Sequence, residues 1–422
     1  MKQHSDQRPM TAIQKIYSRA CRVDYVDVGQ VIYPIPDLVI IHDGFVETAY
    51  RELTGLGYGK IANPERVMFV TDHEVSYGSQ RAIERGRNIR RIAKEWNIGS
   101  VYDVGRGGHG HIFPIEEGII RPGMFMYTYD GHCTNFGAMG ALATSVASEA
   151  STILATGTCW MRVPGTIRVN LKGQLRNGAH ARDVGFVLAH GFSNHRWNVD
   201  HDSKAVEFTG QGLEHLDLAS RVALCNSITE VGIVNVIMAA LPEYAGNAFP
   251  GNHVSDADAA FEAEIVIDLN EIVPQVSLPG GPDRAAVLEA VAGAHIDHAF
   301  IGACGSGMYQ DFVDAMHAMK GKKIAPHVRL FIVPGTVATS QRLADEKILQ
   351  AFMDAGAIVL PPGCGPCAGG SMAPLGPDEV SIATAATNHS GRFGANEGRI
   401  YLASPVTVAA SAVAGHIVAS ST

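Results

Sequence analysis

The sequence predicts an α/β protein of two or three domains with largely parallel strands. At 422 residues the chain is longer than a single hydrophobic core can organise. Short runs rich in β-branched and aromatic residues alternate with longer helical patterns, an order typical of α/β layers. Ligands of open parallel sheets lie outside the carboxyl ends of the strands. Several apolar runs here end in a turn or in chemically capable residues, so we expect one site where strand ends converge.

In the first part of the chain, two strands are expected at residues 67–71 and 124–129. The first ends at Asp72 and His73, and the second at Asp130, Gly131 and His132. An amphipathic helix is expected to begin near residue 79, with its basic residues on a solvated face. A helix of small residues is expected over about residues 137–156.

In the last third, three further strands are expected. Residues 297–304 end at Cys304, residues 328–333 end in a Pro-Gly turn, and residues 356–364 end at Cys364. The run LPGGPDR at residues 278–284 is the best candidate linker, because proline and glycine cluster there between a strand pattern and a helix.

Composition argues against several classes of function. The formal net charge is −9 and no block of lysine and arginine stands out, which argues against nucleic acid as the main ligand. The N-terminus lacks an apolar signal core, and no run of about eighteen apolar residues predicts a membrane span. Seven cysteines, an odd number scattered through a large chain, do not form a disulfide framework. We therefore expect a cytoplasmic protein.

Three cysteines give the strongest chemical signal. Cys304 lies in IGACGSG, while Cys364 and Cys367 lie in PPGCGPCAGG. The C-x-x-C spacing alone fits a zinc site, an iron–sulfur site, a redox pair or two ordinary turn cysteines. A third cysteine in a second glycine-rich turn favours an iron–sulfur cluster, which is normally held by four thiolates. With three thiolates, one iron would stay available to act as a Lewis acid on a substrate.

Histidines and carboxylates near the strand ends predict proton transfer. The pairs are Asp72-His73, His109-Gly-His111 and Asp130-Gly-His132. An imidazole held by a carboxylate is oriented and kept basic, which suits proton transfer near neutral pH. Any one of these histidines fits a solvated loop equally well, but three of them beside the cysteines favour a common site.

Recognition of an acidic substrate requires a guanidinium, whose fork matches a carboxylate bidentately. Arg392, in the loop TNHSGRFG, is the candidate for this contact. Arg162 and Arg182 are possible alternatives, but their sequence context is less informative.

These motifs, in this order, resemble the aconitase superfamily, in particular the large subunits of the isopropylmalate isomerase, (homo)aconitase and dimethylmalate dehydratase type. The resemblance covers nearly the whole chain and is carried by VTDHEVSYGS, GHGHIFPIEEGIIRPGM, YDGHCTNFGAMGAL, VEFTGQGLEHLDLASRVALCNSITEVG, IVPGT, PPGCGPCAGG and TNHSGRFGANEGRIYLASP. It implies three α/β domains around a central cleft, at about residues 1–195, 196–284 and 285–422, without the family's swivelling domain.

The resemblance also implies a chemistry, the reversible dehydration of a small hydroxy di- or tricarboxylic acid. The implied ligands of a [4Fe–4S] cluster are Cys304, Cys364 and Cys367. The implied catalytic residues are Asp72, His73, His111, Asp130, His132 and Glu230. The implied substrate-binding residues are Asn226, Asn388 and Arg392.

Three departures from the family pattern concern the substrate. Gly131 replaces a serine in the family's Asp-Ser-His motif, and GACGSG replaces Gly-Ser-Cys-Thr-Asn-Gly around Cys304. The family's Asn-Arg-Asn-Phe-x-Gly-Arg loop is shortened to residues 388–392, with His389 in place of the first arginine. An imidazole does not reproduce the bidentate fork of arginine. The cluster chemistry is therefore expected to be kept while the substrate stays open among alkylmalates, citramalate, maleate and homocitrate-like acids.

In this superfamily a small swivelling domain supplies the serine that takes the substrate proton. The chain ends after SAVAGHIVASST without such a domain, so we expect a separate small-subunit partner. Two alternatives are a relative of the aconitase X type with an altered metal site, and a non-catalytic relative that binds RNA. The intact C-x-x-C motif argues against the first, and the net charge of −9 argues against the second.

Overall fold

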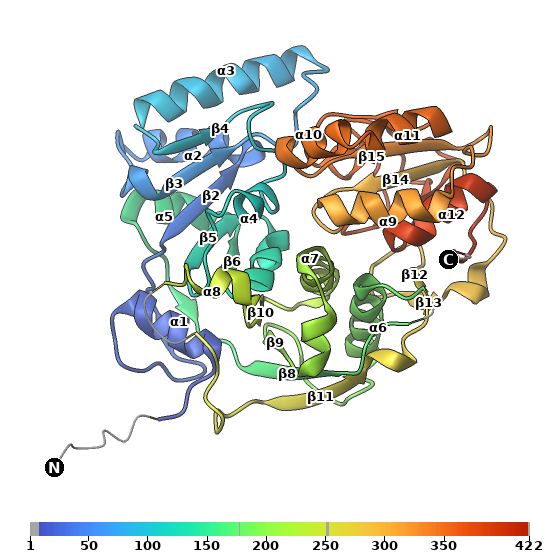
Figure 1. Ribbon diagram of the computed structural model, residues 1–422. Coiled ribbons are helices and arrows are strands. Elements are labelled where there is room, and N and C mark those ends of the chain that lie inside the picture. The colour runs from blue at the N-terminus through green and yellow to red at the C-terminus, as the bar shows by residue number, and fades with distance from the viewer. Residues whose placement is uncertain (1–7, 177, 250–252, 421–422) are drawn as a thin grey trace.

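The computed structural model describes residues 8–176, 178–249 and 253–420, and these are built around three sheets (Figure 1). The first sheet, in blue and teal, and the third, in orange, lie side by side above the second, in green and yellow. A two-stranded antiparallel ribbon joins β1 (Val31–Ile32) to β7 (Met161–Arg162). No helix in the described part of the chain is both long enough and apolar enough to cross a membrane.

The first sheet is parallel, with the strand order β4-β3-β2-β5-β6. Its strands are β2 (Leu38–His42), β3 (Val67–Val70), β4 (Ser100–Tyr102), β5 (Phe125–Tyr129) and β6 (Leu142–Val146). The helices that accompany it are α1 (Ala12–Cys21), α2 (Asp43–Gly55), α3 (Gln80–Glu95), α4 (Phe113–Glu116) and α5 (Glu149–Thr156). The β2 and β3 strands are almost entirely buried, as expected for parallel strands covered on both faces.

The second sheet is also parallel, with the order β10-β9-β8-β11. Its strands are β8 (Thr166–Lys172), β9 (Ala205–Thr209), β10 (Asn235–Met238) and β11 (Ala263–Asp268). The helices α6 (Ala181–Ser193) and α7 (Leu218–Ser227) pack against each other beside it, and the short α8 (Pro242–Ala245) follows β10. The division of the chain at residues 195 and 284 stays a prediction, although β8 places part of the first predicted range in the second sheet.

The third sheet is mixed, with the order β13-β12-β18-β17-β14-β15-β16. Its strands are β12 (Gln275–Ser277), β13 (Ala285–Val287), β14 (His298–Gly302), β15 (Arg329–Val333), β16 (Ile358–Val359), β17 (Val380–Ala383) and β18 (Arg399–Leu402). The helices α9 (Tyr309–Met319), α10 (Val337–Asp345), α11 (Ile348–Ala355) and α12 (Pro405–Ala414) belong to the same part of the chain. Strands β14 to β18 run parallel to one another, while β12 is antiparallel to β13 and β18.

Most of the strand predictions are confirmed. The strands β3, β5, β14 and β15 occur where the apolar runs predict them, and α3 begins after Ser79, whose side chain accepts a hydrogen bond from the Ala82 amide. The predicted helix at residues 137–156 is wrong. A 3₁₀ segment over Gly131–Met139 ends at Gly140 with a φ of 69°, β6 follows, and only α5 is helical. Small residues there favour close packing of a strand against β5 and not a helix.

The run at residues 278–284 connects β12 to β13, which are antiparallel neighbours in one sheet. Residues 285–291, expected to open a helix, form β13 and a 3₁₀ turn over Leu288–Val291. The run is therefore a loop within the third sheet.

The strand orders of the first and third sheets predict two positions where a ligand can bind. In the first sheet the order reverses between β2 and β5, and in the third sheet it reverses between β14 and β17. Crevices at the carboxyl ends of strands form at such switch points. His42 ends β2, Asp130 follows β5, and Cys304 follows β14, so both switch points carry chemically capable residues.

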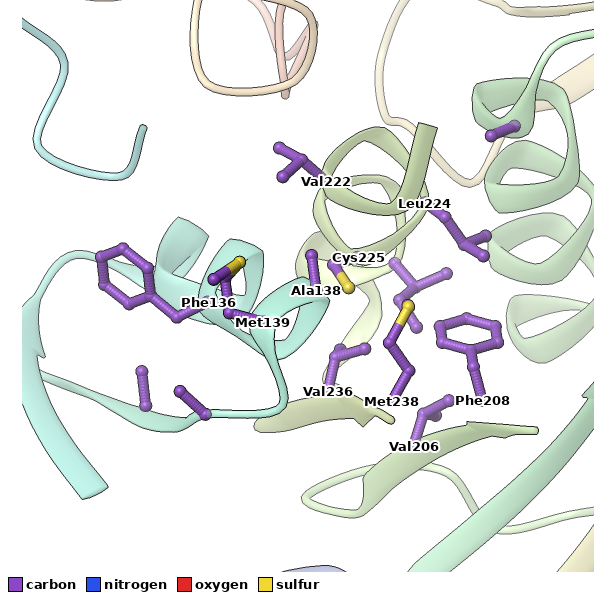
Figure 2. Packing of buried hydrophobic residues seen from close by; sticks show 14 of the residues in the cluster. Phe136, Ala138, Met139, Val206, Phe208, Val222, Leu224, Cys225, Val236 and Met238 are labelled. Carbon is purple, nitrogen blue, oxygen red and sulfur yellow. The ribbon is translucent and has the colours of Figure 1, made fainter. Parts of the chain in front are cut away.

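One hydrophobic cluster ties the first sheet to the second. It joins the 3₁₀ segment before β6 to α7, β9 and β10, as the labelled side chains Phe136, Ala138, Val222, Cys225 and Val236 show (Figure 2). The contact is close because Gly137 has no side chain. A Cβ atom at that position would lie 2.0 Å from the carbonyl oxygen of Val236.

We expect Gly137→Ala to destabilise the fold by about 1–3 kcal/mol, the usual cost of overpacking. The new methyl group meets backbone, which cannot rotate away. Chemical denaturation gives the free energy of unfolding. Gly55→Ala is the matched control: nothing lies within 4 Å of a Cβ atom there, and its helical position favours alanine. Equal stability of the two variants would contradict the close contact.

Candidate functional site

The three cysteines predicted to act together lie in one buried region. Cys304 follows β14, and Cys364 and Cys367 follow β16, with exposed fractions of 4%, 5% and 5%. Burial and the negative charge of Cys367 both raise the pKa of Cys304. Burial raises the pKa of Cys364 well above its ordinary value, with the charges of Asp72 and Cys304 adding to the rise. Cys304 therefore interacts electrostatically with both of the other thiols, as expected if the three residues hold a common group.

The loop that carries Cys364 is anchored to the first sheet. The amide of Cys364 donates a 2.9 Å hydrogen bond to the carbonyl oxygen of Asp72. Gly363 permits this approach, because its φ is 155° and a Cβ atom there would lie 2.7 Å from the same oxygen. The end of β3 and the cysteine loop of the third sheet are thus in direct backbone contact.

Asp72 is a fully buried carboxylate with several donors. It accepts from His42 Nδ1 at 2.9 Å and from the Gly110 amide at 2.8 Å. His73 Nδ1 lies 2.8 Å from Asp72 and 2.8 Å from Asp43. His73 is therefore held between two carboxylates, and Asp72 between two imidazoles.

This arrangement sets the charge of each member. Burial opposes the ionised form of Asp72, but the charges of His42 and His73 outweigh it and hold the Asp72 pKa well below its ordinary value. Burial likewise opposes protonation of His73, yet the charges of Cys364 and Asp72 raise its pKa well above 6.5. An ionised carboxylate flanked by imidazolium groups results.

His42 and Asp43 were not among the predicted site residues. They end β2 and begin α2, at the sheet position where the strand order reverses. The sequence LVIIHDG could have indicated these two residues. It is an apolar run that ends in a histidine and an aspartate, like the runs that end at Asp72 and at Asp130.

His109 and His111 lie on the cysteine side of this network. His109 Nε2 is 3.3 Å from the Cys364 sulfur, and burial lowers the pKa of His109 to about 4. Neither ring nitrogen of the fully buried His111 has a hydrogen-bond partner among the described residues. Burial lowers the pKa of His111 well below 6.5, so its imidazole is neutral. Two unsatisfied nitrogens in a buried ring indicate a place for a polar ligand.

These histidines also approach Cys304. Candidate ligand atoms of His109, His111 and Cys304 all lie within 4.8 Å of one another. The same is true of Asp72, His109 and Cys364. Sulfur and nitrogen donors of this kind suit iron or zinc and do not suit magnesium or calcium.

A second acid–base group follows β5. His132 Nδ1 lies 3.1 Å from Asp130, and His132 Nε2 lies 2.9 Å from Glu230. Burial opposes protonation, but hydrogen bonds to the two carboxylates raise the pKa of His132 to about 10. Asp130 holds its position at a φ of 135°, a conformation that costs a non-glycine residue energy and is found mainly at functional sites.

Asn226, at the end of α7, contacts the first cysteine. Its Nδ2 donates to Asn135 at 3.0 Å and lies 3.3 Å from the Cys304 sulfur. Asn135 in turn donates to the Cys304 carbonyl at 2.9 Å. The asparagine pair thereby fixes the Cys304 turn, and Asn226 Oδ1 has no partner in the part of the chain that is described.

Arg392 and Asn388 differ in their surroundings. Burial opposes the charge of Arg392, but Cys367 raises its pKa through charge and a hydrogen bond, so the guanidinium faces the cysteines. Its charge also lowers the pKa of Glu230. Asn388 Nδ2 instead donates to the carbonyls of Leu278 and Ile400 at 2.8 and 3.0 Å. A substrate contact by Asn388 stays a prediction and would use its unpartnered Oδ1.

Contacts and charge interactions thus join all the predicted site residues except Asn388. They come from the carboxyl ends of strands in the first and third sheets and from the end of α7 beside the second. The arrangement can hold a metal group on buried thiols, keep one imidazole protonated, and present a guanidinium to an anion.

Comparison with known families identifies related proteins. The model of the aconitase family (aconitate hydratase) matches residues 14–240 and 288–415. The chain is 33% identical to the 3-isopropylmalate dehydratase large subunit 1 of Methanopyrus kandleri, covering 96% of this chain and 98% of that one. It is 35% identical to the corresponding large subunit 1 of Archaeoglobus fulgidus, over 96% and 98%. A probable methanogen homoaconitase large subunit of Methanothermobacter thermautotrophicus is 33% identical over 97% of each chain.

A solved structure shares the fold. The crystal structure of Thermococcus kodakaraensis aconitase X in its holo-form superposes with a TM-score of 0.56 and covers 90% of each chain. The sequence identity is 12%, so this likeness concerns the fold alone. It confirms the aconitase-like α/β architecture that the motifs predict.

We expect Glu230→Gln to lower the pKa of His132, because one of two charges that stabilise the imidazolium is lost. In the wild type, protonated His132 stabilises the fold fully below its ordinary pKa of 6.5, and this contribution is lost as pH rises through about 10. In the variant the loss should be complete at a lower pH, because only the folded-state pKa is changed. NMR titration of the imidazole in metal-free protein measures the shift.

The exposed Glu243→Gln on α8 is the control for this titration, and it should leave the His132 pKa unchanged. A Glu230→Gln variant with the wild-type titration curve would show that Glu230 does not act on His132.

Proposed function

Since the chain belongs to the aconitase family, we propose that it is the large subunit of an iron–sulfur-dependent hydro-lyase or isomerase. Its reaction is the reversible dehydration of a small hydroxy di- or tricarboxylic acid. The observation that carries the proposal is the burial of Cys304, Cys364 and Cys367 beside two acid–base groups, with Arg392 facing the same thiols.

The donor set fits a [4Fe–4S] cluster held by Cys304, Cys364 and Cys367. All three thiols are buried, and burial raises the pKa values of Cys304 and Cys364, so ionising them alone is costly; a bound cluster would supply the missing positive charge. The unsatisfied nitrogens of His111 lie beside them, as expected next to a polar group. When bound, a cluster with three protein thiolates offers one iron as a Lewis acid.

His132 is the general acid of the proposal. Its raised pKa keeps the imidazole protonated at neutral pH, so it can give a proton to the departing hydroxyl group. Asp130 holds Nδ1 and Glu230 holds Nε2, so the ring is oriented from both sides. His132 Nε2 lies 2.9 Å from a carboxylate oxygen of Glu230, so in the proposal Glu230 holds the charge beside the proton that Nε2 transfers, and Glu230 stays ionised because His132 lowers its pKa.

The Asp72 network has a different task. Its carboxylate fixes the orientation of His42 and His73, while the neutral His111 ring lies tilted beside His42, with 4.7 Å between the ring centroids. A neutral ring with unpartnered nitrogens can accept a hydrogen bond from water or from a substrate hydroxyl. The network therefore positions acceptors around the reacting carbon.

Arg392 binds a substrate carboxylate in this scheme, because its Nε lacks a partner and its guanidinium is half-buried. His389 acts on Glu230 through its charge, so it lies in the same neighbourhood. A shortened loop with one arginine and one histidine favours a substrate with fewer or smaller anionic groups than a tricarboxylate. The relatives named above point to the alkylmalate class.

The base that removes the substrate proton is proposed to come from a small-subunit partner. Several relatives bear the name large subunit, which supports a two-subunit assembly. All seven cysteines are free thiols, in keeping with the reducing cytoplasm predicted from the sequence.

One observation favours a second candidate, an aconitase-fold enzyme with a mononuclear metal. His109, His111 and Cys304 together form a mixed nitrogen and sulfur donor set. Metal analysis decides between the two, because a cluster brings sulfide in equal amount to iron and a mononuclear site brings none.

We expect Cys304→Ser, Cys364→Ser and Cys367→Ser each to abolish cluster binding, because a hydroxyl is a poor replacement for a thiolate ligand. Anaerobic reconstitution followed by visible absorbance and by iron and sulfide analysis measures the loss. Cys21→Ser on α1 is the control and should bind a full cluster. Serine variants that retain wild-type iron, or an iron-free wild type that is active, would refute the proposal.

We expect Arg392→Lys to raise the KM for a dicarboxylate about tenfold or more, because a lysine cannot grip a carboxylate bidentately. Anaerobic assay of the two-subunit enzyme against a panel of unsaturated diacids, following alkene absorbance, gives the KM. Arg399→Lys, an exposed arginine at the start of β18, is the control. An unchanged KM in Arg392→Lys would remove this residue from the substrate site.

A further inference from the structure

Arg182, near the start of α6, is a buried guanidinium without a carboxylate partner. Its exposed fraction is 0%, and Nη2 donates to the carbonyl of Ala385. Its Nε and Nη1 have no hydrogen-bond partner among the described residues. Two unsatisfied donors on a buried cation are costly, so such a group calls for a nearby negative charge.

The surroundings of Arg182 are apolar. Its guanidinium carbon lies 5.2 Å from the ring centroid of Phe186. Phe186 belongs to a hydrophobic cluster that includes Phe300, Ala385 and Cys367. In a region of low dielectric a cation is stabilised only by a nearby negative charge.

The two closest acidic side chains do not provide that charge. The carboxylate of Asp183 accepts from the amides of His180 and Gln275, at 2.7 and 2.9 Å, and caps the helix. Burial raises its pKa to about 7. Burial raises the pKa of Asp311 well above 3.8, so this side chain is neutral. The remaining groups near Arg182 that could carry a negative charge, as thiolate ligands of a bound metal group, are Cys304 and Cys367.

The absence of a side chain at position 305 creates the space for the guanidinium. A Cβ atom on Gly305 would lie 2.3 Å from Arg182 Nη1 and 2.8 Å from Asn226 Oδ1. Gly305 directly follows Cys304, so Arg182 reaches the side of the cysteine turn that a larger residue would block. The small residues of GACGSG therefore leave the space that the buried guanidinium of Arg182 occupies.

We propose that Arg182 is a positioning residue whose guanidinium neutralises and hydrogen-bonds the cluster-bearing thiolates of Cys304 and Cys367. This inference rests on the proposed cluster and adds an internal counter-charge to it. The free Nε and Nη1 are the donors available for this interaction. A cation beside the thiolates raises the reduction potential of a bound cluster and slows its release, since both reduction and ligand ionisation add negative charge.

Arg221 on α7 provides a matched control, because it is also buried but fully satisfied. Its Nε, Nη1 and Nη2 donate to the carbonyls of Leu216, Ala239 and Leu213 at 3.1, 2.7 and 2.8 Å. Its role is structural. Removal of Arg221 takes a hydrogen bond from three carbonyls, of which only that of Leu213 keeps another donor in the described part of the chain, the Leu216 amide, whereas removal of Arg182 takes a hydrogen bond from one carbonyl.

The experiment compares wild type, Arg182→Met, Arg182→Lys and Arg221→Met, each with and without a reconstituted cluster. Thermal unfolding is measured on the cluster-free proteins. Reduction potential by spectroelectrochemistry and the rate of iron release to a chelator are measured on the loaded proteins.

In the cluster-free state, Arg182→Met should unfold at or above the wild-type temperature, because an uncompensated buried charge has been removed. In the loaded state it should show a more negative potential and about tenfold or faster iron release. Arg182→Lys should recover part of both effects. Arg221→Met should unfold at a lower temperature, with an unchanged potential.

Two outcomes overturn the inference. One is a cluster-free Arg182→Met that unfolds or fails to fold like Arg221→Met, which makes Arg182 structural. The other is a loaded Arg182→Met with the wild-type potential and release rate. Failure of the proposed function is distinguishable, since the wild type and Cys21→Ser would then bind no cluster at all.

Discussion

The buried carboxylate of Asp72 is the interaction on which the rest of the site depends. Its side chain accepts hydrogen bonds from His42 and from the amide of Gly110, while its backbone oxygen accepts from the amide of Cys364. One residue thus connects the ends of β2 and β3, the histidine loop and the cysteine loop of the third sheet. A charge in this position is tolerated only because imidazoles surround it, so the network is cooperative: each member is stable in the presence of the others.

The charges of the site alternate around the thiols. Negative groups at Asp72, Asp130 and Glu230 are each matched by an imidazole, and the thiols are matched by the two guanidinium groups of Arg182 and Arg392. The consequence is a buried, polar centre in a chain of low overall charge. This pairing of charges explains why so many titratable side chains of the site are almost inaccessible to solvent. Each of them has a partner or an atom that faces the proposed ligand.

The sequence predicts the architecture and the strand ends better than it predicts local structure between motifs. Strand ends such as those at Asp72, Asp130 and Cys304 are recognisable because an apolar run stops abruptly at polar residues. The helix expected at residues 137–156 is wrong because Gly137 lies in a 3₁₀ segment that packs closely against Val236 of β10, and β6 follows that segment. Arg182 could not be assigned a role from its neighbours in the chain, since its meaning depends on Gly305, more than a hundred residues away. Long-range steric relations of this kind are visible only in three dimensions.

The distribution of the thiols along the chain has a consequence for biosynthesis. The first and second sheets are complete by Asp268, but every proposed metal-binding cysteine lies at or beyond Cys304. A nascent chain on the ribosome can therefore assemble its first two sheets before any of the cysteines proposed to hold the cluster has been made. In the proposed assembly a cluster can be completed only after Cys367 has been made, and until then the partly formed polypeptide exposes apolar surfaces that the C-terminal third later covers.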